Sequence, residues 1–78
     1  MASNNSKPSF SYRLGRVSGA VWVNLSENTT FYNCRFTRCY KDNDDKWQEG
    51  DSFGAEDLPV LARVIEVCQH YITKEQLR

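Results

Sequence analysis

The sequence lacks the usual means by which very small domains stabilise themselves. Its 78 residues include only three cysteines, Cys34, Cys39 and Cys68, an odd number without C-x-x-C spacing. No secretory signal peptide is recognisable, so we expect reduced thiols in a cytoplasmic protein. The single histidine, His70, gives no metal-ligand spacing, and we expect neither a metal nor a cofactor. Because a chain of this size builds a self-sufficient core with difficulty, we expect a homodimer.

Long apolar runs and an excess of either charge are also missing. No run approaches the roughly 18 apolar residues that span a bilayer, so no membrane partner is expected. Ten basic and ten acidic residues cancel, which removes the basic composition that by itself indicates nucleic acid. The charges are unevenly placed, however: residues 7–41 hold six basic residues and one acid, a net of +5, whereas residues 42–66 hold two basic residues and eight acids, a net of −6. The first half is therefore the better anion-binding surface.

The residue pattern predicts an α+β domain over residues 10–78, behind a disordered polar lead of residues 1–9. Period-two alternation of β-branched and aromatic residues, broken by turn residues, indicates four strands of a curved antiparallel sheet, and a helix follows them. Gly15 and Gly19 are expected to mark a bend or bulge rather than a tight turn. The expected strands are Phe10–Arg16, Val17–Leu25, Phe31–Lys41 and Lys46–Phe53.

A turn at Asn28-Thr29 would sort the second and third strands into two unlike faces. One face would be apolar, and the other would be polar with one aromatic residue, because Trp22 would lie opposite Arg35. The apolar pairs would be Val21 with Phe36, Val23 with Cys34, and Leu25 with Tyr32. In the next hairpin, a turn at Asn43-Asp44 would place Tyr40 opposite Trp47 and Arg38 opposite Glu49.

After Gly54 the period changes to that of a helix, which we expect to run to about Thr73 with Pro59 in its first turn. Its apolar residues form two stripes about 100° apart. We expect one stripe to cover the sheet and the other to meet an identical helix in a homodimer, although one strongly curved sheet could cover both. The sheet-facing stripe is Leu58, Leu61, Ile65, Cys68 and Ile72, and the expected dimer stripe is Val60, Val64, Val67 and Tyr71.

The order of four strands and a terminal helix with two apolar stripes resembles the DNA-binding domain of the transcription coactivator called positive cofactor four, a family with bacterial relatives and a fold shared with the plant Whirly proteins. The similar part of the sequence runs from Tyr12-Arg13-Leu14-Gly15-Arg16 through Val21-Trp22-Val23 and the long strand to Ser52-Phe53-Gly54-Ala55-Glu56-Asp57-Leu58. The resemblance implies a homodimer that binds single-stranded DNA with basic and aromatic residues of curved sheets. The acidic fourth strand and the absence of a Lys-rich lead depart from the eukaryotic coactivator.

Binding of single strands requires cations for phosphates and exposed rings for unpaired bases. We expect Trp22 to stack on bases, Arg35 and Lys41 to contact phosphates on the same face, and Arg13 and Arg16 to extend the basic track. A purely structural alternative is that Trp22 packs against a dimer partner and the charges only keep the face soluble.

Three further residues could lie on the core face or contact the ligand. The resemblance gives Tyr40 a base contact and makes Trp47 its cross-strand neighbour, but alternation assigns both to the core face unless the hairpin projects beyond the helix. Arg38 shares that face, and Glu49 opposite it could neutralise its charge.

The expected function is non-enzymatic, because no base is placed to activate a cysteine. We expect binding of single-stranded DNA or RNA, with transcription or replication proteins as further partners. The alternative is a protein-interaction module on the same fold that binds no nucleic acid and uses the acidic fourth strand or the polar helix face.

Overall fold

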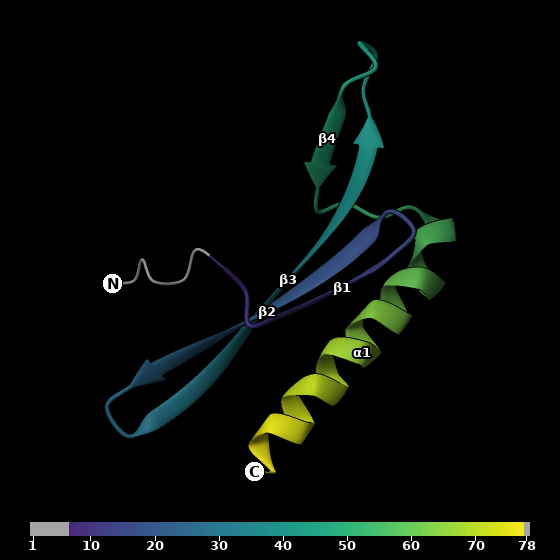
Figure 1. Cartoon of the computed structure of the whole chain (residues 1–78). Coiled ribbons are helices and arrows are strands. Elements are labelled where there is room, and N and C mark those ends of the chain that lie inside the picture. The colour runs from purple at the N-terminus through teal and green to yellow at the C-terminus, as the bar shows by residue number, and fades with distance from the viewer. Residues whose placement is uncertain (1–6, 78) are drawn as a thin grey trace.

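The computed structural model of the chain describes residues 7–77 and has the predicted ββββα order (Figure 1). Four strands form one antiparallel sheet in the order β1-β2-β3-β4, and the terminal helix packs across one face of it, against β1 and β2. The α+β class and the four-stranded sheet are thus confirmed. The elements are β1 (Phe10–Leu14), β2 (Val17–Ser26), β3 (Thr29–Lys41), β4 (Trp47–Gly50), a 3₁₀ turn η2 (Ala55–Asp57) and α1 (Leu58–Gln76).

The first connection is a tight turn, which corrects the expected bend. Leu14 pairs with Val17, so that only Gly15 and Arg16 lie between the strands. Gly15 has a φ of 63°, a backbone conformation that glycine adopts without the steric cost met by other residues. The expected lead falls partly on residues 1–6, outside the described residues. Lys7 to Ser9 are exposed, and the amide of Ser9 already donates to the Val21 carbonyl at 2.8 Å.

The β2–β3 register differs by two residues from the expected one. The turn is Glu27-Asn28, not Asn28-Thr29, because Ser26 pairs with Thr29 and Glu27 takes the positive φ, 41°. Side chains alternate with a period of two, so a shift of two leaves every residue on its predicted face. The individual pairs are wrong, but the division into two faces is right. The observed pairs include Val21 with Cys34, Val23 with Tyr32, Trp22 with Asn33, and Ala20 with Arg35.

The β3–β4 register differs by one residue, which has the opposite effect. Asp42 is joined to Lys46 by a backbone hydrogen bond of 2.9 Å, so the loop has three residues instead of two. Trp47 consequently pairs with Lys41, and Glu49 with Cys39. A shift of one residue moves a strand's side chains to the other face. The predicted pairs of Tyr40 with Trp47 and of Arg38 with Glu49 are therefore wrong.

A very small core joins the helix to the sheet. Its fully buried apolar residues are Val17 and Val21 of β2 and Val64 and Cys68 of α1. The helix approaches closely because β2 presents Gly19 between the two valines. A Cβ built on Gly19 would lie 2.7 Å from a Val64 methyl group and 2.9 Å from the Phe36 ring.

The helix begins later and ends later than expected, after η2 and at Gln76 instead of Thr73. Pro59 lies in its first turn as predicted. The assignment of the two stripes needs correction, because the sheet covers most of both. Val64 of the expected dimer stripe is completely buried against its own sheet, Val60 and Tyr71 are half-buried against the same core, and Val67 is half-buried. Among the described residues, the large apolar side chains of α1 that remain exposed are Leu58 and Ile65, at 54% and 43%.

The molecule is flat and extended for its length. Its radius of gyration is 14.5 Å and its principal extents are 47 × 27 × 14 Å, whereas a compact chain of this size has a radius of gyration of about 11 Å. Figure 1 shows the reason: the β2–β3 hairpin and the β3–β4 hairpin extend away from each other, beyond the layer formed by the sheet centre and α1. A large part of the sheet is consequently not covered by the helix.

Candidate nucleic-acid interface

The sheet face opposite α1 carries no helix and gathers most of the predicted ligand-binding residues. Directly paired residues of antiparallel strands share a face, so Arg13 opposite Ser18 and Arg35 opposite Ala20 lie on the side of Trp22. Lys41 and Trp47 lie there too, by the register of β3 and β4. We call this surface the open face. Its aromatic and basic residues are Arg13, Trp22, Phe31, Arg35, Lys41 and Trp47.

Trp22 and Arg35 border a shallow pocket of about 180 Å³ at the centre of the open face. They are not direct partners, since Trp22 is opposite Asn33, but they lie diagonally on neighbouring strands. The predicted combination of an aromatic ring with a guanidinium on one face is therefore present. The other lining residues are small or polar and include one acid; they are Ser11, Ser18, Gly19, Ala20, Thr37 and Glu49.

Lys41 and Trp47 form a second aromatic and basic pair on the open face. The Lys41 ammonium lies 5.3 Å from the centroid of the Trp47 ring, within the range of a cation–π contact, and Trp47 is 65% exposed. The expectation of a core position for Trp47 is wrong because of the one-residue change in register. Exposed aromatic rings are the feature that single-strand binding requires.

Phe31 was missed at the sequence level, although alternation along β3 contains the signal. It pairs with Asn24, which places it on the face of Trp22, and it is 48% exposed. A large apolar side chain at a polar-face position is more informative than one on the core face. The open face therefore has three aromatic rings, of which Phe31 lies near the end of the β2–β3 hairpin.

Arg38 and Tyr40 lie on the other face, because Arg38 pairs with Val17 and Tyr40 is two positions further along β3. The Arg38 guanidinium is 5.3 Å from the Tyr40 ring centroid, and its Nε donates to the Ser52 carbonyl at 2.9 Å. Asp57, not Glu49, is its acidic neighbour, with Arg38 Nε 3.7 Å from Oδ2. Arg16, in the β1–β2 turn, has its Nε 3.5 Å from Oδ1 of the same carboxylate. These three predicted residues are thus separated from the open face.

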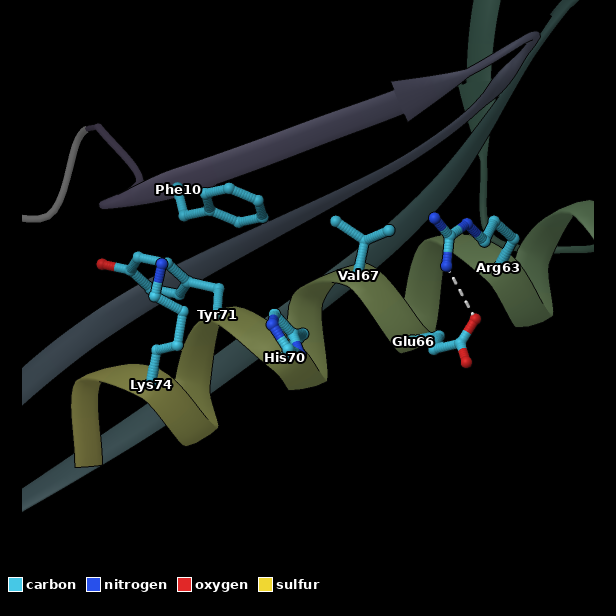
Figure 2. A pocket seen from close by; sticks show the side chains of 7 residues that line it. All are labelled: Phe10, Arg63, Glu66, Val67, His70, Tyr71 and Lys74. Atoms are coloured by element: carbon cyan, nitrogen blue, oxygen red, sulfur yellow. Dashed lines mark hydrogen bonds and ion pairs between the residues drawn. The ribbon is translucent and has the colours of Figure 1, made fainter. Parts of the chain in front are cut away.

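A groove of about 480 Å³ runs between β1 and α1 on the helix side (Figure 2). The Phe10 and Tyr71 rings stack in it, with centroids 4.5 Å apart and planes inclined by 8°. Arg63 donates to Glu66 at 2.9 Å, and this hydrogen bond raises the pKa of Arg63 above its usual value. The remaining lining residues are Val67, His70 and Lys74.

Cys68, Cys34 and His70 lie in different surroundings. Cys68 is in the core, where burial raises the pKa of its thiol, and the pKa of Cys34 is raised in the same direction by desolvation. His70 lines the groove beside β1. Among residues 7–77, no group of three or more His, Cys, Asp and Glu side chains is placed to hold a metal ion. No helix within the same range is long and apolar enough to cross a membrane.

Comparison with known proteins gives this surface no precedent. No family model, curated protein or solved structure matches the chain. The interpretation of the open face therefore depends on its own chemistry.

Proposed function

We propose that the chain is a binding module for single-stranded nucleic acid that works as a homodimer. The observation that supports it is the composition of the open face, where the exposed rings of Phe31 and Trp47 and the half-buried ring of Trp22 lie among cations on a surface that the helix does not cover. Trp22 lies beside Arg35, and Trp47 beside Lys41. Unpaired bases stack on such rings and phosphates pair with such cations, whereas a duplex hides its bases.

The charge of the open face favours moderate binding that weakens with salt. Arg13, Arg35 and Lys41 supply three positive charges, and Glu49 removes one of them. The net charge of the chain is zero and does not itself attract a polyanion, so local phosphate contacts carry most of the electrostatic part of binding. The resemblance to positive cofactor four stays a prediction, and it makes single-stranded DNA the first ligand to test.

The homodimer is proposed on the shape of the single chain. Four fully buried apolar residues form its core, and its radius of gyration exceeds that of a compact chain of equal length. Leu25, Leu58 and Ile65 remain exposed on the helix side and on the extended hairpin. A second copy that covers these side chains would supply the apolar burial that a domain of this size needs.

Binding of a protein partner is the second candidate, favoured by the groove between β1 and α1. The groove combines stacked apolar rings with the basic side chains of Arg63 and Lys74 at its rim. Such a surface suits a protein segment with apolar and acidic residues. This function requires no nucleic acid.

Fluorescence anisotropy tests the proposed function. A labelled thirty-nucleotide single strand is titrated with the protein at low and at moderate salt, with a duplex of the same sequence as control. We expect micromolar or tighter binding that prefers the single strand and weakens as salt rises. No binding at low salt would reject the nucleic-acid function and favour the protein partner. Sedimentation equilibrium of the same sample is expected to give twice the mass of one chain.

A further inference from the structure

Three charged side chains from three different elements meet at the start of the helix. Asp57 of η2 is only 4% exposed, and its two carboxylate oxygens face Arg16 at 3.5 Å and Arg38 at 3.7 Å. It also accepts the Gly54 amide at 3.0 Å. Both guanidiniums therefore lie within 4 Å of one carboxylate, and are close to each other although the residues are 22 positions apart.

Both arginines contact their partners through Nε, the nitrogen at which the guanidinium joins the side-chain stem. Arg16 faces Asp57 through Nε, and Arg38 uses its Nε for Asp57 and for the Ser52 carbonyl at 2.9 Å. Within residues 7–77, the contacts that join the two side chains to Asp57 and Ser52 run through Nε, and the Arg38 guanidinium also lies 5.3 Å from the centroid of the Tyr40 ring. A guanidinium presents five N–H donors in a fixed fork, and its terminal nitrogens match the oxygens of a phosphate. The two guanidiniums and the single Asp57 carboxylate together carry a net charge of one positive unit.

The cluster lies on the helix side of the sheet, next to the β1–β2 turn that contains Arg16. Arg13 of that face folds over the β1–β2 turn, because its Nε donates to the Gly15 carbonyl at 2.9 Å. Arg16 is the next residue of the turn, and its carbonyl accepts the amide of Cys39 beside Arg38 at 2.9 Å. A strand bound at Arg13 would have to pass around the β1–β2 turn, from the open face to the helix side, to reach Arg16 and Arg38.

We propose that Arg16 and Arg38, oriented by Asp57, form a single binding site for one phosphate of the bound strand, which we call the phosphate seat. The inference depends on the proposed function and adds to it a subsite away from the stacking surface. Asp57 is a positioning residue in this seat, because its carboxylate fixes the two forks without touching the ligand.

Salt dependence tests whether the two arginines share one phosphate. The slope of log K against log salt is measured for Arg16→Gln, Arg38→Gln, the double variant and, as matched control, Arg63→Gln, whose side chain pairs with Glu66 in the distant groove. The slope is negative, and we expect each single variant to make it shallower by about 0.7, the value for one phosphate of a single strand. The double variant should make it no shallower than either single variant does. Unchanged slopes, or an additive loss in the double variant, would overturn the shared seat.

The variant Asp57→Asn tests the positioning role. A purely electrostatic role and a positioning role of Asp57 predict opposite changes in the affinity for the single strand. The amide retains an oxygen for the Gly54 amide but removes one negative charge beside two arginines. If Asp57 only opposed the ligand electrostatically, binding would tighten. We expect it to weaken several-fold, with a slope like that of the arginine variants. Tighter binding would reject the positioning role, and circular dichroism and melting of each variant establish that it is folded.

Inorganic phosphate separates this inference from the proposed function. The Nε–H signals of Arg16 and Arg38 are followed by NMR during a phosphate titration, with Arg63 as reference. We expect both signals to move together and to saturate together, and Asp57→Asn to abolish the response. Equal small shifts at all three arginines would overturn the seat. If the seat responds but no single strand binds, the proposed function fails while the seat stands.

Discussion

The two faces of strand β2 differ in what their residues contribute. On the helix side, Val17 and Val21 are fully buried and Gly19 between them lets α1 approach. On the open face, the alternate positions are Ser18, Ala20 and Trp22, which line a shallow pocket instead of a core. Neighbouring residues in one strand thus serve either stability or binding, because the period of two assigns them to opposite sides.

The chemistry of each face fits that division. Burial of aliphatic side chains stabilises the fold by roughly 25 cal/mol for each Å² removed from water, and every fully buried apolar residue lies on the helix side or on α1. Trp47 and Phe31 on the open face remain largely exposed, so they add little to the folding free energy. Apolar rings that are kept at the surface among cations are more typical of a binding surface than of a folding requirement.

The variant Gly19→Ala is expected to give the largest effect and to act only on the helix side. The added methyl group would lie 2.7 Å from Val64 and 2.9 Å from Phe36, and Val64 is fully buried. We expect a loss of about 2–3 kcal/mol in the free energy of unfolding, in the range for overpacked cores. Urea unfolding followed by circular dichroism measures it.

Ser18→Ala is the matched control, one position away on the open face. It is expected to change the free energy of unfolding by less than about 0.5 kcal/mol, as for most substitutions outside the core. Equal losses in the two variants would contradict the division between the faces.

The variant Trp22→Ala is expected to have the converse effect, on binding and much less on folding. Loss of one stacking platform costs about 1–2 kcal/mol, the lower part of the range measured for base–aromatic contacts. Affinity should fall alike for strands of different sequence, because every base has a face to stack. Anisotropy titrations with three homopolymers measure this, and Tyr71→Phe in the groove is the control. Unchanged affinity for Trp22→Ala would remove the ring from the interface.

The sequence predicted the two faces better than it predicted the pairs. In β2 and β3, alternation alone determines which side each residue occupies, so Trp22, Arg35 and Lys41 were assigned to one face despite a turn misplaced by one position. That error moves the register by two, which preserves the faces. In β4 the loop has three residues instead of two, and the resulting shift of one transferred Trp47 to the open face.

The apolar periodicity of the helix did not determine which of its sides packs against the sheet. Two apolar stripes were visible, but which of them meets the sheet depends on where Gly19 allows the closest approach. Val64 lies at that point, so it belongs to the core and not to a dimer contact. The meeting of Arg16, Arg38 and Asp57 could not be read from their spacing either, because it depends on how the β1–β2 turn, β3 and η2 come together.

Acid is expected to give the smallest effect, confined to the loop that sets the position of Trp47. The Asp42 carboxylate accepts the amides of Asp44 at 2.8 Å and Lys46 at 3.0 Å and the side-chain amide of Gln48 at 3.0 Å. These hydrogen bonds, led by the Lys46 amide, hold the pKa of Asp42 below its usual 3.8. Since the pKa is lower in the ordered loop, the disordered loop binds more protons in acid.

The stabilising contribution of Asp42 is therefore complete above its usual pKa and is lost as the pH falls through the lowered value. NMR shifts of the Asp44 and Lys46 amides, followed from about pH 6 to about pH 2, are expected to titrate together with a midpoint below the usual Asp pKa of 3.8. Asp42→Asn should remove that titration and loosen the contact between Lys41 and Trp47, whereas Asp44→Asn, which removes the same charge from the same loop, should leave both. A midpoint at or above the usual value, or equal effects of the two variants, would show that Asp42 does not organise the loop and that another feature places Trp47 on the open face.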